Sequence, residues 1–206
     1  VGLKMGTALL DLAGGQLLPA MFFTMVTSLI LGMGVPTTAN YVITSTIAAP
    51  ALIQLGVPVL AAHMFAFYFG IIADVTPPVA LAAYAGAGIS GGNPMKTGVI
   101  AAKLSIAAFL VPYVFVYNPQ LLLINTTFAG VAFSTVTAII GMVGISVAMI
   151  GYGVRPTNKI QRVLFFVAGL LLVDPGTLTD IIGGVMLVAL FGWQKMQNKS
   201  DAAKQA

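Results

Sequence analysis

Cysteine and glutamate do not occur in this sequence of 206 residues, and His63 is its one histidine. Without cysteine the chain can form neither a disulfide nor a thiolate metal site. An intramembrane protease would need a base, an acid pair or a second metal ligand, yet Asp74 is the only acid between Asp11 and Asp174. The serines and threonines also lack an activating base. These absences argue against an enzyme.

Charge of either sign is scarce as well. Charged residues make up 7% of the sequence and hydrophobic residues 59%, with a mean hydropathy of +1.02. A soluble protein has about 25% charged residues and needs them to cover its surface. The sequence therefore predicts an integral membrane protein in contact with the lipid bilayer.

The net charge of +4 is concentrated in two basic clusters near the C-terminus. They are Arg155, Lys159 and Arg162, and then Lys195, Lys199 and Lys204. Neither cluster is interleaved with aromatic residues, which argues against nucleic-acid binding. Basic residues collect on the cytoplasmic side of a membrane, so we expect both clusters and the C-terminal tail to be cytoplasmic.

Two apolar segments, residues 16–31 and 37–55, flank a stretch with two glycines and a proline. Glycine costs about 1 kcal/mol and proline about 3 kcal/mol within a helix, so one continuous helix is not expected. The first segment reaches only roughly 24 Å at 1.5 Å per residue, which is short of the ~30 Å hydrocarbon core. We therefore predict a re-entrant helical hairpin over residues 16–55 with its tip at 32–38.

A second interruption follows about forty residues later, at residues 74–78. It predicts a discontinuous helix over 57–88. The second half of this helix should begin at Val79 and end near Ala87, and a loop at 88–94 should follow. A helix over 95–117 should follow, with a kink at Pro112.

The complete prediction is an all-α polytopic membrane protein in three parts. Residues 1–125 form one repeat of a transport unit, 126–194 a C-terminal membrane segment, and 195–206 a polar, disordered tail. The second part should hold one full span over 126–152 and a shallow helical hairpin over 163–194, whose apolar stretches number about ten and thirteen residues. The chain start has neither an initiator Met nor a signal-peptide pattern, so we expect it to be the interior of a longer protein.

The first interruption is a candidate binding site because helix ends leave backbone groups unpaired. In hydrocarbon such groups must line a polar cavity or bind a ligand. Carbonyls near Gly32 and Gly34 suit a hard cation such as Na⁺, and free N–H groups near Thr37 and Thr38 suit an anion. The hydroxyls of these threonines and the Asn40 amide add oxygens. The alternative is a plain turn, with Thr37 as the N-cap and the glycines allowing close packing.

The second interruption offers Asp74, Thr76 and Pro77. An intramembrane acid is a functional candidate for binding a cation or a proton, and Pro77 removes a backbone donor and frees a carbonyl. The alternative for Asp74 is an N-cap of a short helix that starts at Pro77 and Pro78. His63 lies about 16 Å from Asp74 along one helix face, too far for a dyad, and is expected to be a hydrogen-bonded core residue.

Two further groups of residues are expected to be structural. The aromatic set Phe65, Phe67, Tyr68 and Phe69 favours packing over cavity lining. Asp174 and Asp180 are expected to cap helix ends at a loop that is in contact with water.

Five stretches of this sequence resemble the large membrane component of the tripartite ATP-independent periplasmic (TRAP) transporters, in particular its fused-permease branch. They are LILGMGVPTTANY at 29–41, AAPAL at 48–52, HMF at 63–65, FYFG at 67–70 and ADVTPPVA at 73–80. The resemblance is close over residues 16–118, and weaker over 126–194, which looks like the extra C-terminal segment of fused permeases.

The resemblance implies a secondary transporter with an elevator mechanism and two inverted repeats, of which this chain holds the second. It implies Na⁺ as the coupling ion, with no other cofactor, and an organic acid as the substrate. The implied partners are an extracytoplasmic substrate-binding protein and the rest of the permease, with its first repeat and small-subunit region, in the cytoplasmic (inner) membrane of a bacterium or archaeon.

By position, the resemblance places one Na⁺ site at the backbone around Gly32 and Gly34, with Asp74, Thr76 and Pro77 lining the second region. We therefore predict ion binding at these five residues. We predict substrate binding at the residues beside them: Pro36, Thr37, Thr38, Asn40 and Pro78. Two alternatives remain: a proton-coupled anion transporter of the same superfamily that uses Asp74, and a structural membrane subunit without transport.

Overall fold

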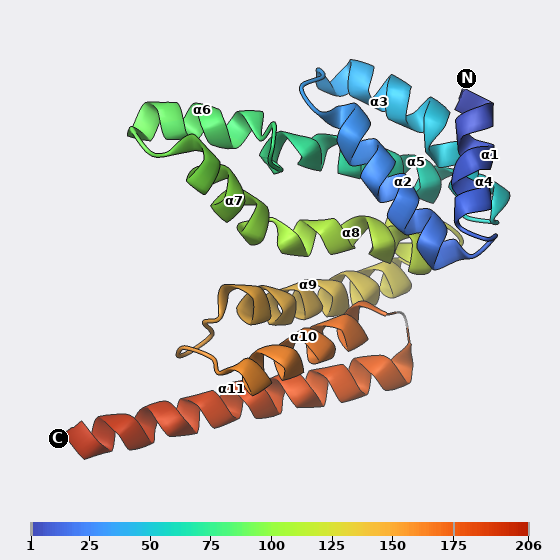
Figure 1. The fold of residues 1–206 in the computed structure, drawn as a ribbon. Coiled ribbons are helices and arrows are strands. Elements are labelled where there is room, and N and C mark those ends of the chain that lie inside the picture. Colours follow the sequence, from blue (N-terminus) through green and yellow to red (C-terminus); the bar gives the residue numbers. More distant parts are fainter. Residues whose placement is uncertain (1, 175, 206) are drawn as a thin grey trace. The chain divides into compact units, whose positions relative to one another are not determined.

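The computed structural model of the chain describes residues 2–174 and 176–205, and within them it is helical with no named strand (Figure 1). The chain divides into two compact units, residues 1–122 and 123–206. The first unit contains α1 (Gly2–Leu12), α2 (Leu17–Gly32), α3 (Thr37–Ile47), α4 (Ala49–Gln54), α5 (Val59–Ile72), η1 (Ala73–Val75), α6 (Leu81–Ser90), α7 (Pro94–Leu104), α8 (Ile106–Tyr117) and η2 (Pro119–Leu122). The second contains α9 (Phe128–Ile150), α10 (Lys159–Val173) and α11 (Thr177–Gln205).

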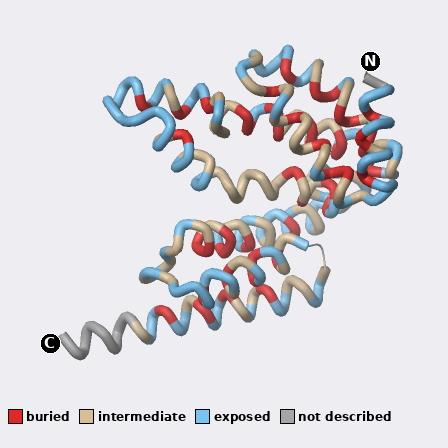
Figure 2. Tube along the Cα trace, viewed as in Figure 1, coloured by how far each residue is buried: buried red, intermediate tan, exposed pale blue. Residues whose placement is uncertain are grey.

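Helices α2 and α3 form the predicted hairpin, and both lie against α5 (Figure 1). The core of this unit consists mainly of alanine and other aliphatic residues packed around two phenylalanines. Phe65 and Phe69 are fully buried, and both make edge-to-face contacts with Tyr113 of α8 at centroid distances of 5.2 and 5.9 Å. Figure 2 shows buried residues concentrated along α5 and the helices beside it. The prediction that these two aromatic residues serve packing is therefore confirmed.

The discontinuous helix is present, with slightly different bounds from those predicted. Helix α5 and the turn η1 end at Val75, and α6 begins at Leu81 rather than Val79. The reason is the left-handed backbone of Ala80, with φ of 37°, which is incompatible with a helix starting earlier. Helix α6 continues to Ser90, because the glycine that ends it in a left-handed conformation is Gly91.

The predicted single helix over 95–117 is two helices that meet at Ser105. The peptide N–H of Ala108 bonds to the Ser105 carbonyl at 2.8 Å, a tighter turn than an α-helix makes. Pro112 lies inside α8. The interruption at Ser105, nearly two turns before the proline, was not predicted, while the kink at Pro112 stays a prediction.

In the second unit, α10 packs against both α9 and α11. Backbones approach closely at glycines: a Cβ added to Gly169 of α10 would lie 2.9 Å from the peptide nitrogen of Ile145 in α9. A Cβ on Gly183 of α11 would lie 2.8 Å from the Ala168 carbonyl oxygen of α10. Small residues are what allow membrane helices to come this close.

Helices α10 and α11 have 15 and 29 residues and so extend beyond the apolar stretches of about ten and thirteen residues that they contain. Helix α11 continues to Gln205, within the segment that was expected to be a disordered tail. The tail prediction was wrong because lysine, glutamine, methionine and alanine, common in that segment, are good helix formers even outside a membrane. The depth of the α10–α11 hairpin in the bilayer stays a prediction.

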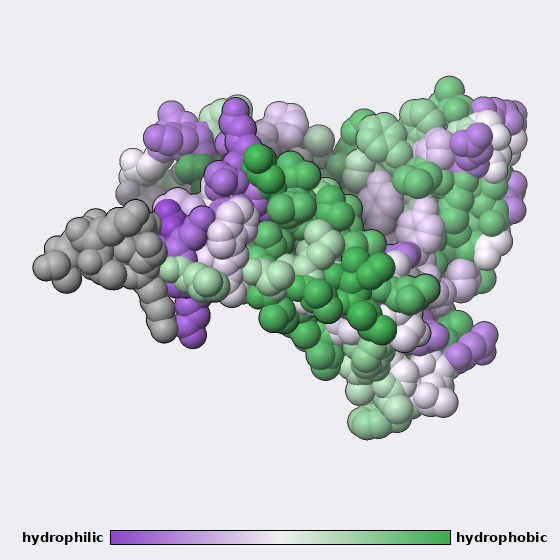
Figure 3. Space-filling model, turned by 90° about the horizontal axis from the view of Figure 1, so that it is seen from below, coloured by the Kyte–Doolittle hydropathy of each residue, from purple (hydrophilic) through white to green (hydrophobic). Residues whose placement is uncertain are grey.

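Three helical stretches are long and apolar enough to cross a membrane: Pro94–Tyr117, Phe128–Ile150 and Thr177–Gln197. Hydrophobic side chains form large continuous areas on the surface seen in Figure 3, as lipid contact requires. Helices α2, α5 and α6 are apolar but shorter. The all-α polytopic membrane fold is thus confirmed, while the re-entrant placement of α2 and α3 stays a prediction.

Candidate functional site

The hairpin tip is an open turn between two helix ends. Helix α2 ends at Gly32, Gly34 has a left-handed φ of 72°, and α3 begins at Thr37 after Pro36. Two weak hydrogen bonds of 3.4 Å close the turn, from the Met33 N–H to the Ile30 carbonyl and from the Val35 N–H to the Gly32 carbonyl. Carbonyl oxygens at the end of α2 are therefore available for other partners.

The start of α3 presents unpaired N–H groups. Asn40 is the first residue of α3 whose N–H bonds back along the helix, to the Pro36 carbonyl at 2.9 Å. Pro36 occupies the N-cap position and has no side-chain cap, so the alternative that Thr37 caps the helix is wrong. Thr37 and Thr38 are exposed in the first turn. This end of α3 has the backbone geometry that attracts anions.

Gly32 and Gly70 bring the hairpin and the discontinuous helix into direct backbone contact. A Cβ added to Gly32 would lie 2.8 Å from the Gly70 Cα atom and even nearer the Gly70 carbonyl oxygen. A Cβ added to Gly70 would lie 2.9 Å from the Asn40 Cγ atom. The Asn40 amide thus sits over the point where α2 and α5 meet, and it is 2% exposed.

Three polar side-chain atoms in this region are buried with no hydrogen-bond partner among the described residues. They are Asn40 Oδ1, Thr24 Oγ1 and Ser28 Oγ, and the two hydroxyl residues are fully buried on α2. Thr24, Ser28 and Gly32 follow at intervals of four residues and therefore share one face of the helix. An unpartnered buried polar group costs about 1–3 kcal/mol unless water or a ligand satisfies it.

The second interruption contains the remaining predicted residues. Asp74 is half-buried in η1, and Thr76 donates its hydroxyl to the Ile72 carbonyl at 2.8 Å, which caps the end of α5. The predicted alternative for Asp74, an N-cap of the following helix, is wrong, because Ala80 holds that position and has no side-chain cap. Pro77 and Pro78 lie between the two helices in a non-helical segment.

Tyr84 and Gly98 support this proline segment. The Tyr84 hydroxyl donates to the Pro78 carbonyl at 2.8 Å. A Cβ on Gly98 of α7 would lie 3.0 Å from the Tyr84 ring and 3.4 Å from Pro77 Cγ. The Pro78 carbonyl is therefore already engaged, while the N–H groups in the first turn of α6 remain unpaired until Tyr84, whose N–H bonds to the Ala80 carbonyl at 3.0 Å.

The two interruptions lie next to each other. Besides the Gly32–Gly70 contact, a Cβ on Gly34 would lie 3.9 Å from Val79 Cγ1, and α2 lies against η1. The structure therefore gathers the end of α2, the Asn40 amide and the 73–79 segment into one region. Pro36, Thr37 and Thr38 are exposed beside it.

His63 has the structural role expected for it. Its Nδ1 atom and the Tyr41 hydroxyl are joined by a hydrogen bond of 3.1 Å, which links α5 to α3. Tyr41 also makes an edge-to-face contact with Phe67 at 5.3 Å, and Tyr68 makes one with Phe115 at 6.1 Å. No group of three or more His, Cys, Asp or Glu side chains able to hold a metal ion occurs in the described part of the chain.

Gly70, Tyr84, Thr24 and Ser28 were not among the predicted site residues. Gly70 does have a sequence signal, because it stands alone among the bulky residues of FAFYFGII. The hydroxyls of Thr24 and Ser28 carry none, since serine and threonine are common in membrane helices and only the fold shows which face is buried.

Comparison with known families agrees with this geometry. The model of the family described as the tripartite ATP-independent periplasmic transporter, DctM component, matches residues 1–130. The chain belongs to this DctM family. No curated protein and no solved structure matches it.

Membership accounts for both the fold and the composition. DctM proteins are the membrane permease component of TRAP transporters, so this DctM chain is a multi-pass inner-membrane transport protein and comes from a family of transporters rather than enzymes. The match covers both interruptions, and the family generally works with a substrate-binding protein and a small subunit.

Proposed function

We propose that this DctM chain imports an organic acid by coupling it to Na⁺, with the substrate delivered by an extracytoplasmic binding protein. It would act together with a first repeat and a small subunit. In this proposal the C-terminal tail is cytoplasmic, because basic residues collect on the cytoplasmic side and both basic clusters of the sequence belong to the second unit.

The observation that carries the proposal is the pair of interrupted helices that meet at Gly32 and Gly70. This arrangement places helix ends of both polarities in one region. The end of α2 and the Asn40 amide supply oxygens for a hard cation, together with Asp74 and the backbone near Thr76 and Pro77. The sodium ion would compensate the buried Asn40 Oδ1 atom, which has no hydrogen-bond partner among the described residues.

The anion would bind at uncapped helix starts. The first turns of α3 and α6 each present N–H groups without intrahelical partners, and neither has a side-chain cap. Thr37 and Thr38 add hydroxyl donors, and Pro36 and Pro78 shape the approach to the two helices. A carboxylate at such sites is stabilised by hydrogen bonds and by the helix dipoles.

A proton-coupled transporter is the second candidate, and Asp74 is the observation that favours it. Its carboxyl group is half-buried at the interruption and makes no hydrogen bond or ion pair in the described part of the chain. Such a group can bind either a proton or a cation.

Uptake of radiolabelled dicarboxylates into proteoliposomes tests the proposal, with the partner subunits and binding protein present. An inward Na⁺ gradient should drive uptake, and Asp74→Asn should lower it about tenfold or more, as expected for loss of one charged ligand. Asp11→Asn is the matched control, because Asp11 is exposed on α1 outside the site. Uptake that is the same with and without a Na⁺ gradient, but is abolished by Asp74→Asn, favours proton coupling. Absence of uptake of any tested acid under all gradients favours a structural subunit.

A further inference from the structure

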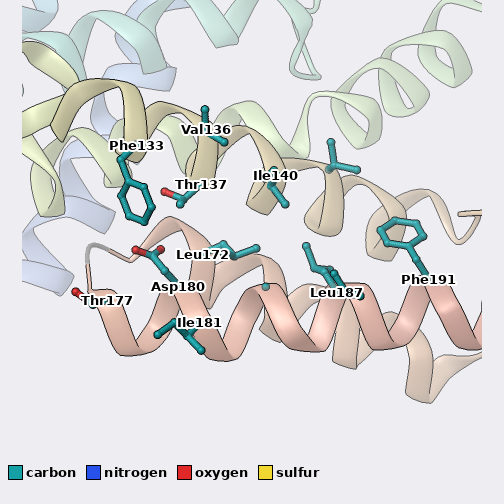
Figure 4. A pocket seen from close by; sticks show the side chains of 13 residues that line it. Phe133, Val136, Thr137, Ile140, Leu172, Thr177, Asp180, Ile181, Leu187 and Phe191 are labelled. Carbon is teal, nitrogen blue, oxygen red and sulfur yellow. The ribbon is translucent and has the colours of Figure 1, made fainter. Parts of the chain in front are cut away.

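A groove in the second unit has no role in the proposed transport site. It has a volume of about 690 Å³ and runs between α9 and α11. Its walls are almost entirely apolar: Phe133, Ile140 and Val143 come from α9, and Ile181, Val188 and Phe191 from α11 (Figure 4). Gly184 forms part of the floor and leaves open space where a side chain would stand.

One carboxyl group breaks this apolar lining. Asp180 lies at one end of the groove, and Figure 4 shows its side chain directed from α11 toward α9. Its Oδ1 atom is buried and has no hydrogen-bond partner among the residues that the structure describes. The nearby Thr137 hydroxyl donates to the Ser134 carbonyl at 3.2 Å instead. Among the described residues that line the groove there is no lysine, arginine or histidine.

The position of Asp180 indicates what kind of molecule fits. It is in the first turn of α11, three residues after the start of the candidate span Thr177–Gln197. The carboxyl group is therefore about one turn, roughly 5 Å, inside the end of the span, close to the level of lipid head groups. From Asp180 the groove continues to Phe191, about 16 Å further along the helix, which is the direction of an acyl chain.

We propose that this groove binds a phospholipid whose head group carries a primary ammonium, such as phosphatidylethanolamine. The acyl chain lies along Ile140, Gly184 and Val188, and the ammonium donates to the unpartnered Asp180 oxygen. The charge and the N–H donors of an ammonium complement a carboxylate at the end of an apolar groove. Phosphatidylcholine has the same charge but no N–H donor, so the site should discriminate between the two. The inference rests on the groove and on α11 crossing the bilayer, and it is independent of the transport proposal.

Lipid retention measures this discrimination. The protein would be purified with its partner subunits from nanodiscs that contain equal amounts of phosphatidylethanolamine and phosphatidylcholine with identical acyl chains, and bound lipid would be counted by native mass spectrometry. We expect about tenfold preferential retention of phosphatidylethanolamine, the discrimination that one charge-assisted hydrogen bond provides. Asp180→Asn should abolish the preference, and Asp11→Asn, which removes an exposed carboxylate from α1 in the other unit, should keep it.

A second pair of variants tests the place of the acyl chain. Gly184→Leu fills the groove and should lower retention of both lipids, whereas Gly192→Leu also points into open space but lies outside the groove lining. Equal retention of the two lipids by the unmodified protein would overturn the proposal. So would a preference that survives Asp180→Asn, or a groove that holds no lipid because a helix of another subunit occupies it.

Discussion

At position 70 a side chain has no room. The Gly70 backbone touches Gly32 of the hairpin on one side and the Asn40 amide on the other. We therefore expect Gly70→Ala to destabilise the protein by about 1–3 kcal/mol, the usual cost of overpacking a close contact. Thermal unfolding in detergent measures this loss as a lower Tm.

Gly86→Ala is the matched control for that substitution. Gly86 lies in α6, and a Cβ there meets nothing within 4 Å. Alanine favours a helix over glycine by roughly 0.5–1 kcal/mol, so the control should unfold at an equal or higher temperature. Equal Tm values for the two variants would contradict the close contact at Gly70.

Asn40 provides a test of cation binding that does not need transport. A cation that binds only the folded protein stabilises it, by about 2.7 kcal/mol at a concentration one hundred times its Kd. We expect the Tm of the unmodified protein to rise with NaCl but not with choline chloride. Asn40→Leu removes the buried oxygen and should abolish the difference between the two salts. A sodium-dependent rise that persists in this variant would remove Asn40 from the ion site.

The sequence was informative at single residues where the backbone imposes the structure. Gly34, Pro36 and Pro77 predicted the two interruptions because the conformational freedom of glycine and the fixed φ of proline act locally. The contact of Gly32 with Gly70 could not be predicted, since it depends on how two helices far apart in the chain pack. The same is true of Asn40, whose burial follows from that packing.

At the scale of elements, Arg162 joins the start of α10 to the end of α9. Its Nη2 atom donates to the Met149 carbonyl at 2.9 Å, and its Nε atom donates to the Ala148 carbonyl at 2.6 Å. These carbonyls belong to the last turn of α9, which lacks intrahelical partners, and a positive charge is also favourable there.

Arg162→Met should therefore loosen the end of α9. Loss of these charge-assisted hydrogen bonds is expected to cost about 1.5–3 kcal/mol. Amide hydrogen exchange should become faster over residues 148–153. Lys159→Met is the matched control: it removes a charge from the same helix, but the Lys159 side chain makes no hydrogen bond to the described residues of α9. Hydrogen exchange over residues 148–153 should therefore be unchanged in this variant. Similar exchange in both variants would show that Arg162 does not stabilise this helix end.

Helix boundaries were less predictable than helix interruptions marked by glycine or proline. Nothing in the sequence around Ser105 breaks a helix, and the neighbouring residues are apolar on both sides, so the junction of α7 and α8 follows from tertiary packing. For α11 the sequence predicted an end that is absent, since the helix continues to Gln205. A change from apolar to polar composition marks the edge of the membrane but does not end a helix.

At the scale of the whole molecule, the absence of cysteine makes labelling of introduced cysteines unambiguous. We expect Lys195→Cys to react with a membrane-impermeant maleimide only from the cytoplasmic side. The candidate span in α11 has 21 residues, about 31 Å, and is long enough to cross the hydrocarbon core. Thr177→Cys should therefore react from the opposite side. Reaction of both cysteines from the cytoplasm would instead support the shallow hairpin predicted from the sequence.

Gly32 and Gly70 pack backbone against backbone, so no space is left between the hairpin and the discontinuous helix at this point. Helices α2 and α3 cannot separate from α5 without breaking the contact between the Asn40 side chain and Gly70. We therefore propose that the hairpin and the discontinuous helix move as one rigid body during transport, with any sliding surface on the outer faces of that body.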